Sequence, residues 1–150
     1  MSDALTPLYF RFFNEIGIIN QLATAVLESR LPDGLLAPHF TVLNHLVRVK
    51  DGRTPLEMAT AFQIPKTTMT HQIRVLERHG LVGLAPNPED GRSKRVWLTE
   101  AGRTLREGII HGFADVVQDW SKLIDPEEVA DLLPRLERIR IHLDQARNAD

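Results

Sequence analysis

The feature that most constrains the fold is a pair of short helices predicted within residues 54–79 and joined by a link of three residues. Thr54 can cap the first helix, Pro55 suits its first position, and Glu57 completes a capping box. Gly80 follows the second helix, as a glycine that ends a helix does. The sequence therefore predicts a helix-turn-helix.

The second of these helices separates apolar from polar side chains. Met69, Ile73 and Leu76 form a narrow apolar stripe at helical spacing. The opposite face carries hydroxyls, an imidazole and two guanidiniums, from Thr67, Thr70, His71, Arg74 and Arg78. Such groups can donate hydrogen bonds to phosphates and to acceptors on base edges. A helical hairpin with a solvated polar face is an equal alternative at this point.

The segment after Gly80 favours DNA binding. Residues 81–85 and 96–98 are predicted strands, and residues 86–93 between them are rich in turn formers. Lys94 and Arg95 make the return strand basic. A major-groove helix followed by a basic hairpin that can reach the minor groove or the backbone is a winged helix-turn-helix.

The chain resembles the MarR-type (multiple antibiotic resistance regulator) transcription factors. The motifs that carry the resemblance are Leu43, Leu46, Gly52–Ala59, Thr67–Thr70, Leu76–Val82, Pro88–Arg92 and Leu98–Gly102. The resemblance implies a homodimeric, cytoplasmic transcription regulator, often a repressor released by a small ligand. Pro65, His71 and Leu84 depart from the family pattern, which puts the usual operator preference in doubt but not DNA binding.

The fold class predicted is mainly α with a small β-hairpin wing, in a single domain of residues 1–150. The candidate DNA-binding residues are Lys66, Thr67, Thr68, Thr70, His71, Arg74 and Arg78 in the second helix and Arg92, Lys94 and Arg95 in the wing. The expected partner is a pseudo-palindromic operator of double-stranded DNA. A winged-helix protein-interaction module without DNA binding is the alternative function.

Charge is unevenly distributed along the chain. Residues 48–106 hold eleven Lys and Arg against six Asp and Glu, a net charge of +5, whereas the remainder carries −7. The basic charge therefore coincides with the predicted winged module, as a phosphate-binding surface requires.

The flanking segments, residues 1–34 and 100–150, are predicted to be dimerisation helices around a winged lobe of residues 35–99. The first helix is expected to start with Thr6 as cap and Pro7 at its first position and to end at Pro32–Gly34. Thr99 is expected to cap a continuous helix that reaches Ile124. These helices are apolar on more than one side, which favours an intertwined homodimer over a single monomeric core.

The last helix has clear start signals. Asp125 can cap it, with Pro126 first and Glu128 for a capping box, and Pro134 is expected to kink it.

Catalysis has little support in the sequence, and no cofactor is expected. The chain has no cysteine, and none of the common metal-protease, hydrolase or phosphate-loop motifs appears. A metal site that uses His39, His45 or His111 across a dimer is a minor alternative, so no metal is expected. No signal peptide or membrane span is expected either.

An effector pocket is harder to predict. The resemblance places such a pocket between the flanking helices and the winged lobe, where Phe10, Phe13, His39, His45 and His111 are the candidate lining residues. A small aromatic acid or phenol is the effector that the resemblance implies. The operator, the regulated genes and the sign of regulation do not follow from the sequence.

Overall fold

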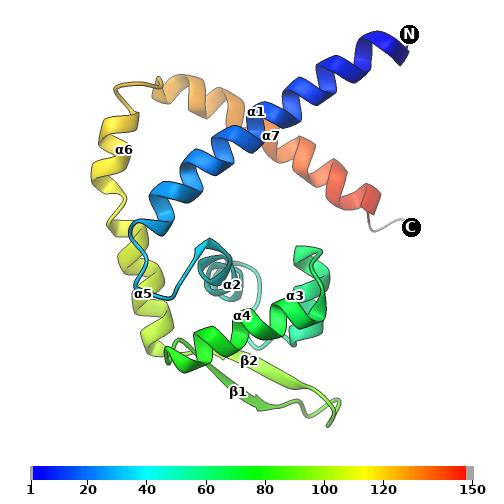
Figure 1. The fold of residues 1–150 in the computed structure, drawn as a ribbon, viewed down its shortest axis with the longest axis vertical. Helices are drawn as coiled ribbons and strands as arrows, with labels where there is room; N and C mark the ends of the chain where they lie inside the picture. Colours follow the sequence, from blue (N-terminus) through cyan, green and yellow to red (C-terminus); the bar gives the residue numbers. More distant parts are fainter. Residues whose placement is uncertain (1, 148–150) are drawn as a thin grey trace. The chain divides into compact units, whose positions relative to one another are not determined.

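The computed structural model describes residues 2–147, with side chains from residue 5 onward (Figure 1). The elements are α1 (Ser2–Glu28), α2 (Ala37–Arg48), α3 (Pro55–Phe62), α4 (Lys66–Arg78), β1 (Val82–Pro86), β2 (Lys94–Leu98), α5 (Glu100–His111), α6 (Ala114–Trp120) and α7 (Pro126–Arg147). Residues 1–110 and 111–150 form two compact units, which are described separately. The predicted mainly helical fold with a β-hairpin is confirmed.

The core of the first unit lies between α2, α3, α4 and the hairpin. The stripe of Met69, Ile73 and Leu76 is buried, at 2% exposure or less, as its spacing predicts. The core consists of Leu35, Val42, Leu43, Leu46, Met58, Ala59, Met69, Ile73, Val75, Leu76, Leu81, Val82 and Val96. Burial of these apolar side chains fixes the polar face of α4 outward.

The helix-turn-helix forms as its capping signals predict. The Thr54 hydroxyl accepts from the Glu57 N–H at 3.2 Å, and the Glu57 carboxylate accepts from the Thr54 N–H at 2.7 Å. Gln63 ends α3 in the left-handed region, with a φ of 53°, and Gly80 has a φ of 69° after α4. These two residues set the turns at which the chain changes direction.

The predicted start of the first helix is wrong. α1 spans Ser2–Glu28, so Pro7 lies inside the helix and Thr6 is not its cap, and the helix ends before Pro32. Pro7 is the sixth residue of α1, where it has no N–H to donate to the carbonyl four residues earlier. At the other end, the Glu28 carboxylate accepts from the Ala37 N–H at 2.9 Å and so satisfies a free donor at the start of α2.

The sheet contains more than the predicted hairpin. β1 and β2 pair antiparallel, with Val82 opposite Leu98 and Pro86 opposite Lys94. β1 begins and ends one residue later than predicted, and β2 begins two residues earlier than predicted and ends at Leu98 as predicted. Arg53 adds an isolated antiparallel bridge to Val96, whose N–H donates to the Arg53 carbonyl at 2.8 Å. This bridge ties the base of the wing to the segment before α3.

The predicted continuous helix from Thr99 to Ile124 is also wrong. Thr99 does cap α5, because its hydroxyl accepts from the Gly102 N–H at 3.1 Å, but α5 ends at His111 and α6 begins at Ala114. Gly112 lies in the break, and glycine costs about 1 kcal/mol relative to alanine inside a helix.

In the second unit, Asp125 caps α7 as predicted, since its carboxylate accepts from the Glu127 N–H at 2.9 Å. Pro134 lies within α7. The kink expected there and the role of Glu128 in the cap stay predictions.

Candidate nucleic-acid interface

The outer face of α4 is the first part of the candidate interface. Its Lys66, Thr67, Thr68, His71, Arg74 and Arg78 side chains are exposed. Thr70 is half-buried, and its hydroxyl donates to the Lys66 carbonyl at 2.8 Å. The sequence predicts Thr67, Thr70, His71, Arg74 and Arg78 on one outer face and adds Lys66 and Thr68 as candidate contacts. All seven lie on α4 outside its buried stripe.

The start of α4 has no side-chain cap, because Pro65 occupies the N-cap position. The first turn of an α-helix leaves its backbone N–H groups without helical partners, and these groups favour anions. Lys66, Thr67 and Thr68 in this turn are exposed. Backbone donors, a cation and two hydroxyls therefore gather at one end of the outer face.

The far end of α4 is held by His79. Its Nδ1 lies 2.8 Å from the Val75 carbonyl and its Nε2 lies 3.2 Å from the Asp33 carbonyl, in the loop between α1 and α2. The imidazole therefore ties the end of the helix to a segment 46 residues earlier in the chain. The sequence does not reveal this role of His79, because nothing local marks Asp33 as its neighbour.

The wing tip, residues 87–93, is built by side-chain turns. The Asn87 Nδ2 donates to the Ser93 Oγ at 3.0 Å, and its Oδ1 accepts from the Glu89 N–H at 3.2 Å. The Asp90 carboxylate accepts from the Arg92 N–H at 3.0 Å and so holds the backbone of Arg92. The hairpin extends beyond the helices with this tip at its end (Figure 1).

The ten candidate residues are not equivalent in the structure. The Arg95 guanidinium is directed into the protein, whereas the Arg92 and Lys94 side chains are exposed. Within the described part of the chain, Lys66, Arg74, Arg78, Arg92 and Lys94 form no ion pair. By contrast, Arg140 in α7 pairs with Glu137 and Asp144. Cations without internal partners are available to an external anion.

Two histidines of α2 lie inside the first unit. His39 is buried, and its Nδ1 accepts from the Leu36 N–H at 2.8 Å. The His45 ring packs edge-on against Phe62 at a centroid distance of 4.9 Å, and its Nε2 is buried without a hydrogen-bond partner. Burial lowers the pKa of His39 and, together with Arg53, that of His45.

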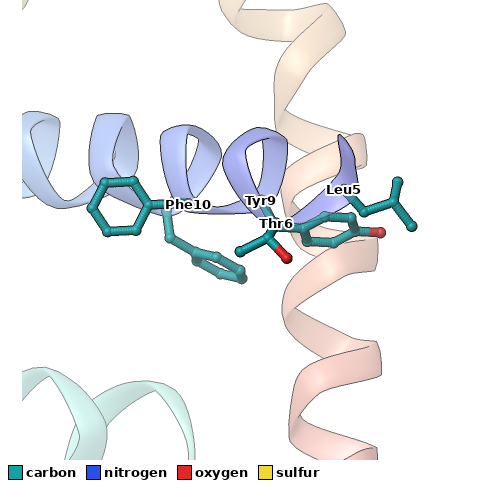
Figure 2. Close-up of a pocket in the computed structure, with 5 residues that line it drawn as sticks. Leu5, Thr6, Tyr9 and Phe10 are labelled. Carbon is teal, nitrogen blue, oxygen red and sulfur yellow. The ribbon is translucent and has the colours of Figure 1, made fainter. Parts of the chain in front are cut away.

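Phe10 and Phe13 lie on α1 and line an open surface hollow with Leu5, Thr6 and Tyr9 (Figure 2). His39 and His45 do not line this hollow, and His111 falls in the second unit. The structure therefore places two of the five candidate pocket residues together at one surface.

The described residues contain neither a metal-binding cluster nor a membrane-spanning helix. Among residues 2–147, no group of three or more His, Asp or Glu is arranged to hold a metal ion. Over the same range, no helix combines the length and apolarity needed to cross a bilayer.

The first unit has the fold of a winged helix-turn-helix, an architecture that many DNA-binding proteins use. Residues 33–93 match the MarR family. Transcriptional activatory protein BadR of Rhodopseudomonas palustris is 28% identical over 102 residues, which cover 67% of this chain and 57% of BadR. The match thus spans little more than half of BadR.

Solved structures agree with this assignment. A mutant of E. coli MarR in complex with operator DNA is 27% identical, with a TM-score of 0.72, over 86% of this chain and 93% of that one. Bordetella bronchiseptica BpsR, whose DNA binding is regulated by 6-hydroxynicotinic acid, shares the fold at 24% identity, with a TM-score of 0.70, over 87% of this chain and 98% of BpsR. Residues 33–93 thus match the MarR family, and the fold is similar to that of MarR-family structures.

Proposed function

We propose that this protein is a sequence-specific, ligand-responsive transcription repressor that binds operator DNA as a homodimer, in the cytoplasm and without catalytic activity. The observation that carries the proposal is the set of exposed cations without internal partners on α4 and on the wing. Both elements belong to one compact unit, so a single surface can present them to a duplex. The family and the operator complex of E. coli MarR support the same function.

The two elements suit different grooves. Arg74 lies at the centre of the outer face of α4, where a guanidinium can reach base edges or phosphates of the major groove. Arg92 lies at the narrow wing tip, where it can enter the minor groove and meet its negative potential. Lys66, Thr67, Thr68, Thr70, His71, Arg78 and Lys94 complete the proposed contact set, whereas Arg95 is left out because its guanidinium is occupied.

Selection of bound DNA from a random pool tests this function, followed by affinity measurements over a salt series. Wild-type protein should select a pseudo-palindrome with half-sites about one helical turn apart. Arg92→Ala should weaken binding by about 1–3 kcal/mol and make the salt dependence shallower by about one counterion per protomer. Arg74→Ala should lose discrimination at defined base pairs. Failure to enrich any sequence at low salt would contradict the proposal.

Exposed apolar side chains support the homodimer. On α1 these include Leu8 and Leu22, and on α7 they include Leu133 and Leu143, all at least half exposed. Apolar surface of this extent on water-facing helices usually marks an interface. A second copy of the chain supplies matching surface by symmetry.

An aromatic acid is the effector we propose. The Tyr9, Phe10 and Phe13 side chains line the hollow on α1, and aromatic rings offer stacking surface to a flat ligand. The regulation of BpsR by 6-hydroxynicotinic acid supports this ligand class. The ligand must bind free protein better than DNA-bound protein, because only differential affinity shifts the equilibrium. Salicylate-like compounds should therefore weaken operator binding, and a thermal-shift screen without a stabilising acid would contradict this.

The wing provides one observation for the alternative, a protein-interaction module. Trp97 on β2 is 44% exposed, and exposed aromatic side chains are typical of protein-docking faces. Under this alternative, Arg92→Ala would leave DNA affinity unchanged at every salt concentration.

Repression and activation are separated by a reporter gene placed behind the selected operator, whose expression should rise when the gene for this protein is deleted.

A further inference from the structure

The Arg95 guanidinium is held by acceptors within the protein, whereas the Arg92 and Lys94 side chains are exposed. Its Nε donates to the Asn87 Oδ1 at 3.1 Å, its Nη1 to the Gly52 carbonyl at 3.2 Å, and its Nη2 to the Glu89 carboxylate at 3.2 Å. The side chain is only 20% exposed. The planar fork of arginine suits three such acceptors at once.

Two of the three acceptors belong to the wing tip that carries Arg92. Asn87 connects to both sides of the tip, because it accepts from the Glu89 N–H and donates to the Ser93 hydroxyl. Glu89 and Ser93 flank Arg92 in the chain. Arg95 therefore holds Asn87 and Glu89, on one side of Arg92, directly, and Ser93, on the other side, through Asn87.

The third acceptor, Gly52, belongs to a fixed segment outside the wing. The Asp51 carboxylate accepts from the Leu98 N–H at 3.0 Å, and the Arg53 carbonyl accepts from the Val96 N–H at 2.8 Å. Gly52 between them is buried, with a φ of 69°. Arg95 thus ties the wing tip to the backbone that leads into α3.

We propose that Arg95 is a positioning residue of the DNA-binding surface, which locks the wing tip against the segment before α3 and presents Arg92 without contacting DNA itself. The proposal rests on the proposed function. A loop that is already ordered loses less conformational freedom on binding, so its contacts contribute more to affinity. Removal of the lock should cost roughly three- to tenfold in affinity.

The test compares the operator affinities of wild type, Arg95→Ala, Arg95→Lys, Arg92→Ala and the Arg92→Ala/Arg95→Ala double variant over a salt series. Arg95→Ala should weaken binding and leave the slope of affinity against salt unchanged, because no phosphate contact is lost. Arg95→Lys should not rescue binding, since one ammonium cannot replace the three-pronged fork. The double variant should bind like Arg92→Ala alone, because Arg95 acts through Arg92.

Lys94→Ala is the matched control, since this neighbour is exposed and is proposed to contact phosphate, so its loss should make the slope shallower. Hydrogen exchange at the Arg92 and Ser93 amides of the free protein should accelerate in Arg95→Lys but not in Lys94→Ala. Glu89→Gln removes only the exposed ion pair and should give a smaller loss of affinity than Arg95→Ala. This variant still tests the proposal if Arg95→Ala unfolds the lobe.

Wild-type affinity in Arg95→Lys would overturn the positioning role, and so would a shallower salt slope in Arg95→Ala or additive losses in the double variant. Each of these results requires that wild type binds the operator, so they leave the proposed function intact. Failure of wild type itself to bind DNA would overturn the proposed function and the positioning role together.

Discussion

At the scale of single residues, two glycines place the backbone in the left-handed region in different surroundings. Gly52 and Gly80 both have a φ of 69°. A Cβ on Gly52 would lie 2.5 Å from the Trp97 ring, whereas a Cβ on Gly80 would meet no atom within 4 Å. Both positions disfavour a side chain through backbone strain, but only Gly52 also lacks space.

Gly80→Ala should therefore cost about 1–2 kcal/mol of unfolding free energy from strain alone. Gly52→Ala should cost about 2–4 kcal/mol, because Trp97 must also move. Gly91→Ala is the control, since Gly91 has open space and no left-handed φ, and its effect should be under about 0.5 kcal/mol. Urea unfolding measures all three, and equal losses for Gly52 and Gly80 would rule out the steric contribution of Trp97.

At the scale of elements, α2 carries two titratable side chains that face the interior, the buried His39 and the half-buried His45. His39 supplies an acceptor to the Leu36 N–H, and His45 lies against Phe62 with its Nε2 unpaired. Burial is the largest cause that lowers the pKa of each ring. His71 and His79 lower the pKa of His39 further, and Arg53 that of His45.

These shifts make the stability of the first unit sensitive to acid. The unfolded chain binds protons below the ordinary histidine pKa of about 6.5, whereas the folded chain resists protonation to a lower pH. The contribution of the two histidines to the unfolding free energy should thus be complete above about pH 7. It should fall as the pH drops from about 6.5 through the lowered pKa values. Urea unfolding between about pH 8 and pH 5 checks this.

His39→Asn keeps a side-chain acceptor, and His45→Leu removes an unpaired polar atom, so both variants should flatten the pH dependence. His142→Asn, in an exposed position of α7, should leave it unchanged. Unaltered acid sensitivity in the His39→Asn/His45→Leu double variant would assign the effect to other groups.

The sequence predicted helix ends correctly where they depend on residues close together in the chain. Thr54 and Glu57 form the predicted capping box, Gly80 ends α4, and Thr99 caps α5. The break after His111 was missed because the apolar spacing continues across Gly112, and spacing alone does not report where a helix divides.

The candidate site was predictable from sequence where it depends on helical periodicity. The α4 residues share one outer surface because the opposite stripe is buried. The inward direction of Arg95 was not predictable, since it depends on Gly52, 43 residues away in the chain. Asn87 was missed although its partners lie within eight residues, because the Asn-Pro pair marks a turn without showing which groups Asn87 will bond.

At the scale of the whole molecule, the terminal helices expose more apolar surface than the winged module. Leu8 on α1 is 61% exposed and Leu133 on α7 is 62% exposed. Leu56 on α3 is similarly exposed, at 57%, but lies outside the terminal helices. Substitutions at Leu8 and Leu133 test burial in the proposed interface. A substitution at Leu56 controls for the general effect of changing an exposed leucine.

We expect a dimer at micromolar concentration by light scattering or sedimentation. Leu8→Asn and Leu133→Asn should weaken the dimer, by about 1–3 kcal/mol each, because each places a polar amide in an apolar interface. Leu56→Asn should leave the dimer intact. A wild-type monomer, with or without DNA, would contradict the dimer, and equal effects of all three substitutions would contradict the assigned interface.

The hydrogen bond from the Thr70 hydroxyl to the Lys66 carbonyl limits which bases that side chain can recognise. The hydroxyl has one proton, and its donation within α4 leaves only lone pairs and a methyl group for the groove. Lone pairs accept from the exocyclic amino groups of adenine and cytosine, whereas the O6 of guanine and the O4 of thymine offer no proton. In the selected operator, the base opposite Thr70 should therefore be adenine or cytosine, or a thymine read through its methyl group, and guanine should be rare there.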